Sequence, residues 1–197
     1  MAVGDLNGDK TPDVVIVENK FGSILWFENS GKPAQDAEWG RQVIADRTVP
    51  NAYDVAVGDL DGDGDLDVAA ATHWTNAIYW YENPGAAALG SGPWRQHTVD
   101  ADLKESRTVR VADLDRDGDA DLLATGTEAG LVVWYENEGR AAGGAWRRRV
   151  IAETSRPMHG DTADLDGDGD LDVVMAAGME SRATPPGEVV WYENTRT

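Results

Sequence analysis

The sequence contains no cysteine, few basic residues and no long hydrophobic run. The absence of cysteine excludes disulfides, thiolate metal ligands and cysteine nucleophiles. The longest apolar stretch, residues 173–179, is far shorter than the roughly 20 residues that a membrane-spanning helix needs. Because 17 basic residues face 36 acidic ones, the formal charge is -19, which disfavours nucleic acid and anionic membranes as partners. Cations, neutral ligands and basic proteins suit such a surface.

Catalytic signatures are lacking as well. The sequence has no G-x-S-x-G motif, no glycine-rich phosphate loop and no H-E-x-x-H motif. His159 and Asp161 lie close in sequence, but such a pairing is common by chance and does not by itself indicate acid–base catalysis. We therefore predict that the chain is not an enzyme.

An internal repeat organises almost the whole sequence. Four acidic segments begin at Asp5, Asp59, Asp113 and Asp164, separated by 54, 54 and 51 residues. Each is followed by an aromatic motif of the form Trp-Tyr/Phe-Glu-Asn, which begins at Trp26, Trp80, Trp134 and Trp191. A third motif, Trp followed five residues later by Ile or Val, begins at Trp39, Trp94 and Trp146 and has no fourth copy. Tandem repeats of this length are typical of propellers and other repeat architectures.

Each repeat predicts four short strands. In the second repeat these cover residues 55–58, 66–72, 77–81 and 95–99, separated by segments rich in Gly, Pro, Asn and Asp. Four-strand units repeated in tandem indicate an all-β fold, a β-propeller with four blades of four short antiparallel strands. The last blade should lack its outer strand. We expect a single domain over residues 1–197, with blades at about 1–46, 47–100, 101–152 and 153–197.

The acidic segment between the first two strands of each repeat predicts a cation site. Carboxylates at alternate positions 1, 3 and 5 converge when the backbone curls around an ion, and a glycine at position 6 permits that curl. Position 7 can offer its carbonyl, and the aspartate at position 9 can close the shell. Ligands that are all hard oxygens select calcium, so we expect up to four Ca²⁺ ions. The predicted metal residues are Asp5, Asn7, Asp9, Thr11, Asp13, Asp59, Asp61, Asp63, Asp65, Asp67, Asp113, Asp115, Asp117, Asp119, Asp121, Asp164, Asp166, Asp168, Asp170 and Asp172.

The four loops are not equivalent. The second and fourth are complete, whereas Arg116 replaces a glycine in the third. The first has Asn7 at position 3 and Lys10 at the glycine position, so it should bind most weakly. The loop is not an EF-hand, because position 12 of the second loop is Ala70 rather than a bidentate glutamate.

These loops resemble those of the FG-GAP/VCBS-type calcium-binding propellers, which include integrin α-subunit heads. The D-x-D-x-D-G-x-x-D pattern carries the resemblance, and the W-Y-E-N motif is similar to that of the bacterial and fungal branch. The resemblance implies side-chain ligands at positions 1, 3, 5 and 9 and a carbonyl ligand at position 7. Apart from Phe21-Gly22 and fragments, the literal FG and GAP strings are missing, so an integrin-type ligand is not implied.

A second site is predicted on the opposite face of the propeller, where the second-to-third-strand loops and the inter-repeat connections meet. His73, Trp74, His159 and Asp161 depart from the repeat there and are the candidate ligand-binding residues. An exposed Trp suits stacking against a sugar, although packing on a neighbouring loop explains it equally well.

The most economical interpretation is a calcium-binding propeller that acts as a binding or scaffold module. A lectin-like carbohydrate-binding propeller is the first alternative, and an enzyme-associated or lyase/dehydratase-type propeller is the second. The partner is then a glycan or a protein, and two chains could also complete one ring as a homo-oligomer. The resemblance implies an extracellular or cell-surface location. No signal peptide precedes the first motif, so if the natural protein is secreted we expect this chain to be a piece of it.

Overall fold

The structure is a computed structural model that describes residues 1–32, 34, 39–139, 146–178 and 187–195. The described residues form strands and turns and no helix, as the sequence predicts. The first sheet consists of β1 (Ala2–Gly4), β2 (Asp13–Glu18), β3 (Ser23–Glu28) and β4 (Gly40–Ala45). The second consists of β5 (Ala52–Gly58), β6 (Asp67–Thr72), β7 (Ala77–Glu82) and β8 (Arg95–Asp100). The membrane search, made over the same residues, finds no helix that is long and apolar enough to cross a bilayer.

The second half of the chain repeats this arrangement. The third sheet consists of β9 (Ser106–Ala112), β10 (Asp121–Gly126), β11 (Leu131–Glu136) and β12 (Arg147–Glu153). The fourth consists of β13 (Pro157–Ala163), β14 (Asp172–Ala177) and β15 (Glu188–Tyr192). Each sheet is an antiparallel meander in chain order, and the fourth has three strands among the described residues.

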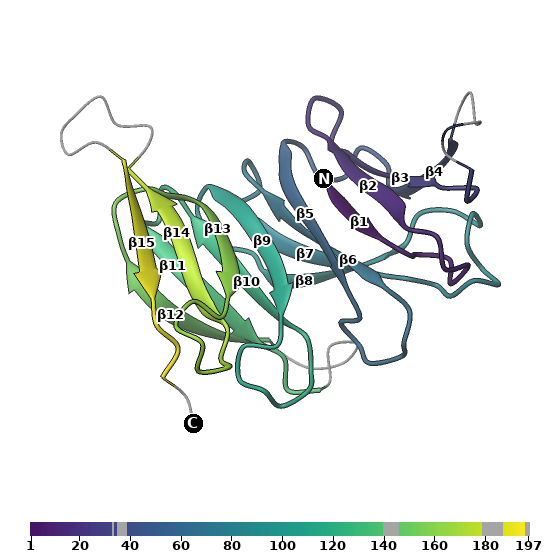
Figure 1. Ribbon diagram of the computed structural model, residues 1–197. Coiled ribbons are helices and arrows are strands. Elements are labelled where there is room, and N and C mark those ends of the chain that lie inside the picture. The colour runs from purple at the N-terminus through teal and green to yellow at the C-terminus, as the bar shows by residue number, and fades with distance from the viewer. Residues whose placement is uncertain (33, 35–38, 140–145, 179–186, 196–197) are drawn as a thin grey trace.

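The sheets follow one another along the molecule. In Figure 1 the sheet β1–β4 lies at one side and the sheet β13–β15 at the other, with the second and third sheets between them. The first strand of each later sheet packs against the first two strands of the preceding one: β5 against β1 and β2, β9 against β5 and β6, and β13 against β9 and β10. The second strands of the two middle sheets, β6 and β10, are therefore covered on both faces and buried along their whole length.

Three hydrophobic clusters fill the three interfaces between successive sheets. Trp26 lies in the first cluster, Trp80 in the second and Trp134 in the third, and all three indoles are at most 5% exposed. Burial of such side chains contributes about 1.5–3 kcal/mol each. The tryptophans of the aromatic motif thus join neighbouring repeats, as their position in the sequence predicts.

The outward face of the fourth sheet is different. Val189 is 78% exposed and Trp191 is 47% exposed, whereas the corresponding Ile78 and Trp80 of the second sheet are fully buried. Leu165, which follows the first aspartate of the fourth loop, is 50% exposed, whereas the corresponding Leu60 is 1% exposed. In the first three sheets the following sheet covers these positions. The described part of the chain places no further sheet on the fourth.

Candidate metal-binding loops and the opposite face

The acidic loops connect the first and second strands of each sheet and are curled by their own carboxylates. In the second loop, Asp59 at position 1 accepts hydrogen bonds from the backbone N–H groups of Gly62 (2.8 Å) and Gly64 (2.9 Å). Both glycines have positive φ, which residues with a Cβ rarely adopt. The same two hydrogen bonds recur in the fourth loop, from Gly167 and Gly169 to Asp164. The Asp-Gly alternation therefore turns the chain back on itself.

The aspartate at position 9 anchors the loop to the rest of its sheet. Asp67 is 1% exposed, and its Oδ2 accepts from Leu60 N–H (2.9 Å) while its Oδ1 accepts from Asn83 N–H (2.8 Å). The corresponding pair of hydrogen bonds is present at Asp13, Asp121 and Asp172. Position 9 thus ties the start of the loop to the residue that ends the aromatic motif.

Three of the loops bring carboxylates together. One oxygen from each member of a triad lies within 4.8 Å of the others, and the triads are formed by positions 1, 3 and 9: Asp59, Asp61 and Asp67; Asp113, Asp115 and Asp121; Asp164, Asp166 and Asp172. The carboxylates at position 5, such as Asp63, lie outside the triads and accept the backbone N–H of position 7 instead. The structure therefore gathers three of the four side-chain ligand positions that the family pattern implies.

Burial and mutual repulsion make two carboxylates of the second loop and two of the third costly to ionise, whereas backbone hydrogen bonds, first that from Asn194, lower the pKa of Asp172 in the fourth loop. Burial raises the pKa of Asp67 to about 7 and that of Asp121 to about 6, against backbone hydrogen bonds that act in the opposite direction. The pKa values of Asp61 and Asp115 are also raised, first by burial and further by the charges of neighbouring acids. A bound cation would remove this cost.

The donor set fits a hard divalent cation. Each triad offers carboxylate oxygens without nitrogen or sulfur, which is the ligand chemistry of calcium and magnesium. In the third loop, Oδ1 of Asp113 is buried and has no hydrogen-bond partner among the residues that the structure describes. An ionised buried oxygen needs a compensating partner, and a cation within the triad would supply one.

The first and third loops deviate from this pattern. In the first, Lys10 adopts a positive φ of 72° at position 6, and no triad of acids forms among its residues, all of which the structure describes. Thr11 donates to Asp9 Oδ1 (2.6 Å) and to the carbonyl oxygen of Asn29 (2.8 Å). In the third, Arg116 has a φ of 63° and forms an ion pair with Asp170 of the fourth loop.

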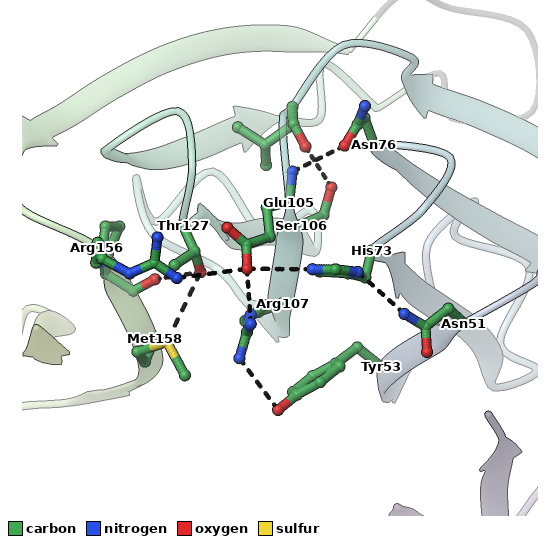
Figure 2. Close-up of polar contacts among 12 residues, drawn as sticks. Asn51, Tyr53, His73, Asn76, Glu105, Ser106, Arg107, Thr127, Arg156 and Met158 are labelled. Carbon is green, nitrogen blue, oxygen red and sulfur yellow. Dashed lines mark hydrogen bonds and ion pairs between the residues drawn. The ribbon is translucent and has the colours of Figure 1, made fainter. Parts of the chain in front are cut away.

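The opposite face carries a network of hydrogen bonds and ion pairs. Figure 2 shows Glu105 at its centre, where Oε1 lies 3.1 Å from His73 Nε2, 2.6 Å from an Arg107 nitrogen and 3.6 Å from an Arg156 nitrogen. The pKa of Glu105 is lowered, because these hydrogen bonds and the two guanidinium charges outweigh the opposing effect of burial. The network joins residues of the second, third and fourth repeats.

The structure places the four predicted ligand-binding residues as follows. His73 is held on both sides, by Glu105 through Nε2 and by Asn51 through Nδ1 (3.0 Å), and Trp74 beside it is 71% exposed. His159 and Asp161 line an open cavity of about 300 Å³. Tyr53 lies between the two histidines, 6.4 Å from the ring of His73 and 6.2 Å from that of His159.

Two groups of residues near the loops were not predicted as functional. The first group is the asparagine that ends the aromatic motif, which donates a side-chain hydrogen bond to the preceding repeat at Asn83, Asn137 and Asn194. The fixed position of this asparagine in the motif could have suggested such a role. Glu82 and Glu136 of the same motif add negative charge next to Asp61 and Asp115. Because Glu82 and Glu136 are far from the acidic loops in the sequence, this proximity was not predicted.

Tandem four-strand sheets with aspartate-rich loops define an all-β repeat protein with candidate metal sites. Residues 5–70, 59–124 and 113–175 match the model of the FG-GAP-like repeat. The chain belongs to the FG-GAP-like repeat family.

The search of curated proteins finds no match. Among solved structures, the V. cholerae biofilm matrix protein Bap1 is similar, with a TM-score of 0.57 and 20% sequence identity over 100% of this chain. The similar region makes up 27% of the Bap1 chain. At this identity the likeness concerns the fold alone.

Proposed function

We propose that the chain is a calcium-stabilised β-propeller unit that serves as a non-catalytic binding or scaffold module outside the cell. The observation that carries this proposal is the recurrence of the same carboxylate triad in three successive loops. Calcium is favoured because the donors are all oxygen and because Ca²⁺ accepts carbonyl and water ligands beside carboxylates. Four Ca²⁺ ions would reduce the formal charge of the protein from -19 to -11.

The propeller arrangement is supported by a hydrogen bond that recurs between successive sheets. The side-chain Nδ2 of Asn83 donates to Leu6 O (2.9 Å), that of Asn137 to Leu60 O (2.9 Å) and that of Asn194 to Leu114 O (2.8 Å). A constant rotation from each sheet to the next would produce the same contact at each step. Repeating one rotation builds an arc of blades.

A matrix or adhesion role is supported by the fold shared with Bap1, which is described as a biofilm matrix protein. Repeat units of this kind offer extended surfaces, and the acidic surface of this chain suits neutral or basic partners.

Calcium binding is tested by comparing Asp61→Asn with a matched control. Asp61 belongs to a triad, whereas Asp46 is an exposed aspartate outside the loops, and each substitution removes one negative charge. We expect Asp61→Asn to remove one calcium ion from the stoichiometry measured by isothermal titration, and Asp46→Asn to leave it unchanged. Equal stoichiometry in both variants, or no calcium binding by the parent, would contradict the proposal.

Binding of a neutral glycan is a second candidate function, favoured by the 71% exposure of Trp74 beside a polar network. An exposed indole stacks on the apolar face of a sugar. On a glycan array, Trp74→Ala should abolish binding with no loss of stability, whereas Phe21→Ala, a change of another exposed aromatic in a strand connection, should retain binding. If the parent protein binds no glycan on the array, this second candidate function is contradicted.

A further inference from the structure

The third and fourth acidic loops are joined by an ion pair. A guanidinium nitrogen of Arg116, at position 4 of the third loop, contacts Oδ1 of Asp170, at position 7 of the fourth. The side chain of Asp170 is 8% exposed, whereas that of Arg116 is 52% exposed. A Cβ added at Gly169 would lie 2.9 Å from the same nitrogen, so the guanidinium lies directly against the backbone of the fourth loop.

The second loop has no such contact with the loop before it. Position 4 of the first loop is Gly8, so no side chain extends from there toward the second loop. Asp65, the counterpart of Asp170, forms no ion pair with any basic residue that the structure describes. The charge at position 7 is therefore paired in the fourth loop and unpaired in the second.

This difference is informative because the second and fourth loops have identical sequences. Residues 59–67 and 164–172 both read Asp-Leu-Asp-Gly-Asp-Gly-Asp-Leu-Asp. In both, the N–H of the glycine at position 6, Gly64 or Gly169, donates to the aspartate at position 1 (2.9 and 3.1 Å), and positions 1, 3 and 9 form a triad. Any difference in their affinity for a cation must therefore come from their surroundings.

Arg116 places a fixed positive charge in the surroundings of the fourth triad. Its partner Asp170 lies outside the triad but two residues from Asp172, which belongs to it. Arg116 therefore acts on a bound ion through its charge and does not replace a carboxylate of the triad. A unit charge roughly 10 Å from a divalent cation in water changes the binding affinity about threefold to tenfold.

We propose that Arg116 is a built-in counter-ion that lowers the calcium affinity of the fourth loop. In the calcium-free protein its guanidinium neutralises one of the five carboxylates of that loop, and it repels a calcium ion that enters the triad. This inference rests on the proposed calcium binding and adds to it a residue that makes two loops of identical sequence unequal.

The test follows each loop separately in the intact chain. Gly64, Gly118 and Gly169 occupy position 6 of the second, third and fourth loops, and the N–H of each donates to the position-1 carboxylate of its own loop. Their amide resonances, in protein labelled with isotope-enriched glycine, report a calcium titration loop by loop. In Arg116→Gly, the resonance of Gly169 should reach half of its shift at a calcium concentration about threefold to tenfold lower than in the parent, while that of Gly64 keeps its midpoint.

Conservative and matched variants separate charge from shape. Arg116→Lys keeps the charge and should keep the parent midpoint at Gly169, whereas Arg116→Gln should behave like Arg116→Gly. Arg47 is another exposed arginine with a positive φ (53°), but it lies between β4 and β5, on the face opposite the acidic loops. Arg47→Gly should therefore leave all three midpoints unchanged. The effect of Arg116→Gly should also shrink at high salt, because exposed charges are screened.

The converse change is available in the second loop. Gly8 has open space for a side chain, and its φ of 74° is close to the 63° of Arg116. Gly8→Arg places an arginine at the position that corresponds to Arg116, next to the second loop. It should raise the calcium midpoint of Gly64 and leave that of Gly169 unchanged, with thermal unfolding used to confirm that the variant is folded.

Two results would overturn the inference. The first is a Gly169 midpoint that stays the same or rises in Arg116→Gly, and the second is an equal response of Arg116→Lys and Arg116→Gly. Calcium-induced shifts that ignore Arg116 contradict this inference alone. If none of the three glycine resonances responds to calcium, the proposed calcium binding itself is contradicted, and this inference with it.

Discussion

Asn83 donates a side-chain hydrogen bond to the carbonyl oxygen of Leu6, 77 residues earlier in the chain, at 2.9 Å. The same amide donates to Leu66 O of its own loop (3.0 Å), and its Oδ1 accepts from Gly85 N–H (3.1 Å). One buried side chain therefore joins two loops of successive repeats. This explains structurally why an asparagine ends each aromatic motif.

Replacing such an asparagine should weaken the contact between neighbouring sheets. Asn137 is 4% exposed and bridges Leu60 O and Ala120 O, so Asn137→Ala leaves two buried carbonyl groups without their donor. We expect the free energy of unfolding to fall by about 1–3 kcal/mol in urea denaturation. Asn7→Ala, in the exposed first loop, serves as the control and should cost less than half of this. Equal effects would show that Asn137 does not couple the repeats.

Position 9 of each loop should be needed for folding even without metal. Both carboxylate oxygens of Asp67 accept backbone hydrogen bonds, and Asp67→Ala removes both. The expected loss is about 2 kcal/mol or more in chelator, measured by chemical denaturation. Asp63→Ala changes a carboxylate outside the triad and should have a smaller effect under the same conditions. If the two variants unfold alike in chelator, the anchoring role of Asp67 is wrong.

The network around Glu105 should stabilise the protein in a pH-dependent way. Because its pKa is lowered in the folded state from an ordinary value of 4.5, Glu105 contributes stability above that value and loses it as the pH falls through the folded-state pKa. Glu105→Gln should therefore cost about 2 kcal/mol at pH 7, since Arg107 loses its charged partner. The difference between the parent and variant should narrow as the pH falls below about 4.5, where Glu105 becomes protonated. A difference that does not change with pH would contradict an ionised Glu105.

The strands and loops were predictable because both are encoded locally and repeated. Trp80 recurs in register with Trp26 and Trp134, and alternate aspartates with glycines specify a curled loop without any distant contact. The four sheets, their chain order and the membership of positions 1, 3 and 9 in one cluster agree with this expectation.

The features that were not predicted depend on contacts between residues that are far apart in the sequence. His73 and Glu105 are 32 residues apart and meet only because their turns share one end of the sheets. The burial of Asn83 and a cavity beside Tyr192 arise from the stacking of one sheet on another, which the local pattern does not report. For the same reason the contacts of His73 with Asn51 and Glu105 were not predicted, although His73 itself was a candidate.

The most direct measurement is the thermal unfolding of the chelated protein before and after calcium is added, together with elemental analysis of the protein after dialysis against buffer that contains a known millimolar concentration of calcium. Binding to the folded state alone stabilises it by mass action, and per-site affinities of about 10⁻⁴ to 10⁻³ M are expected for an extracellular module. We expect at least three calcium ions per chain, one for each triad, and a melting temperature that rises by several degrees with calcium but much less with equal magnesium. A protein that contains no calcium and melts at the same temperature in chelator and in millimolar calcium would contradict the calcium-stabilised propeller.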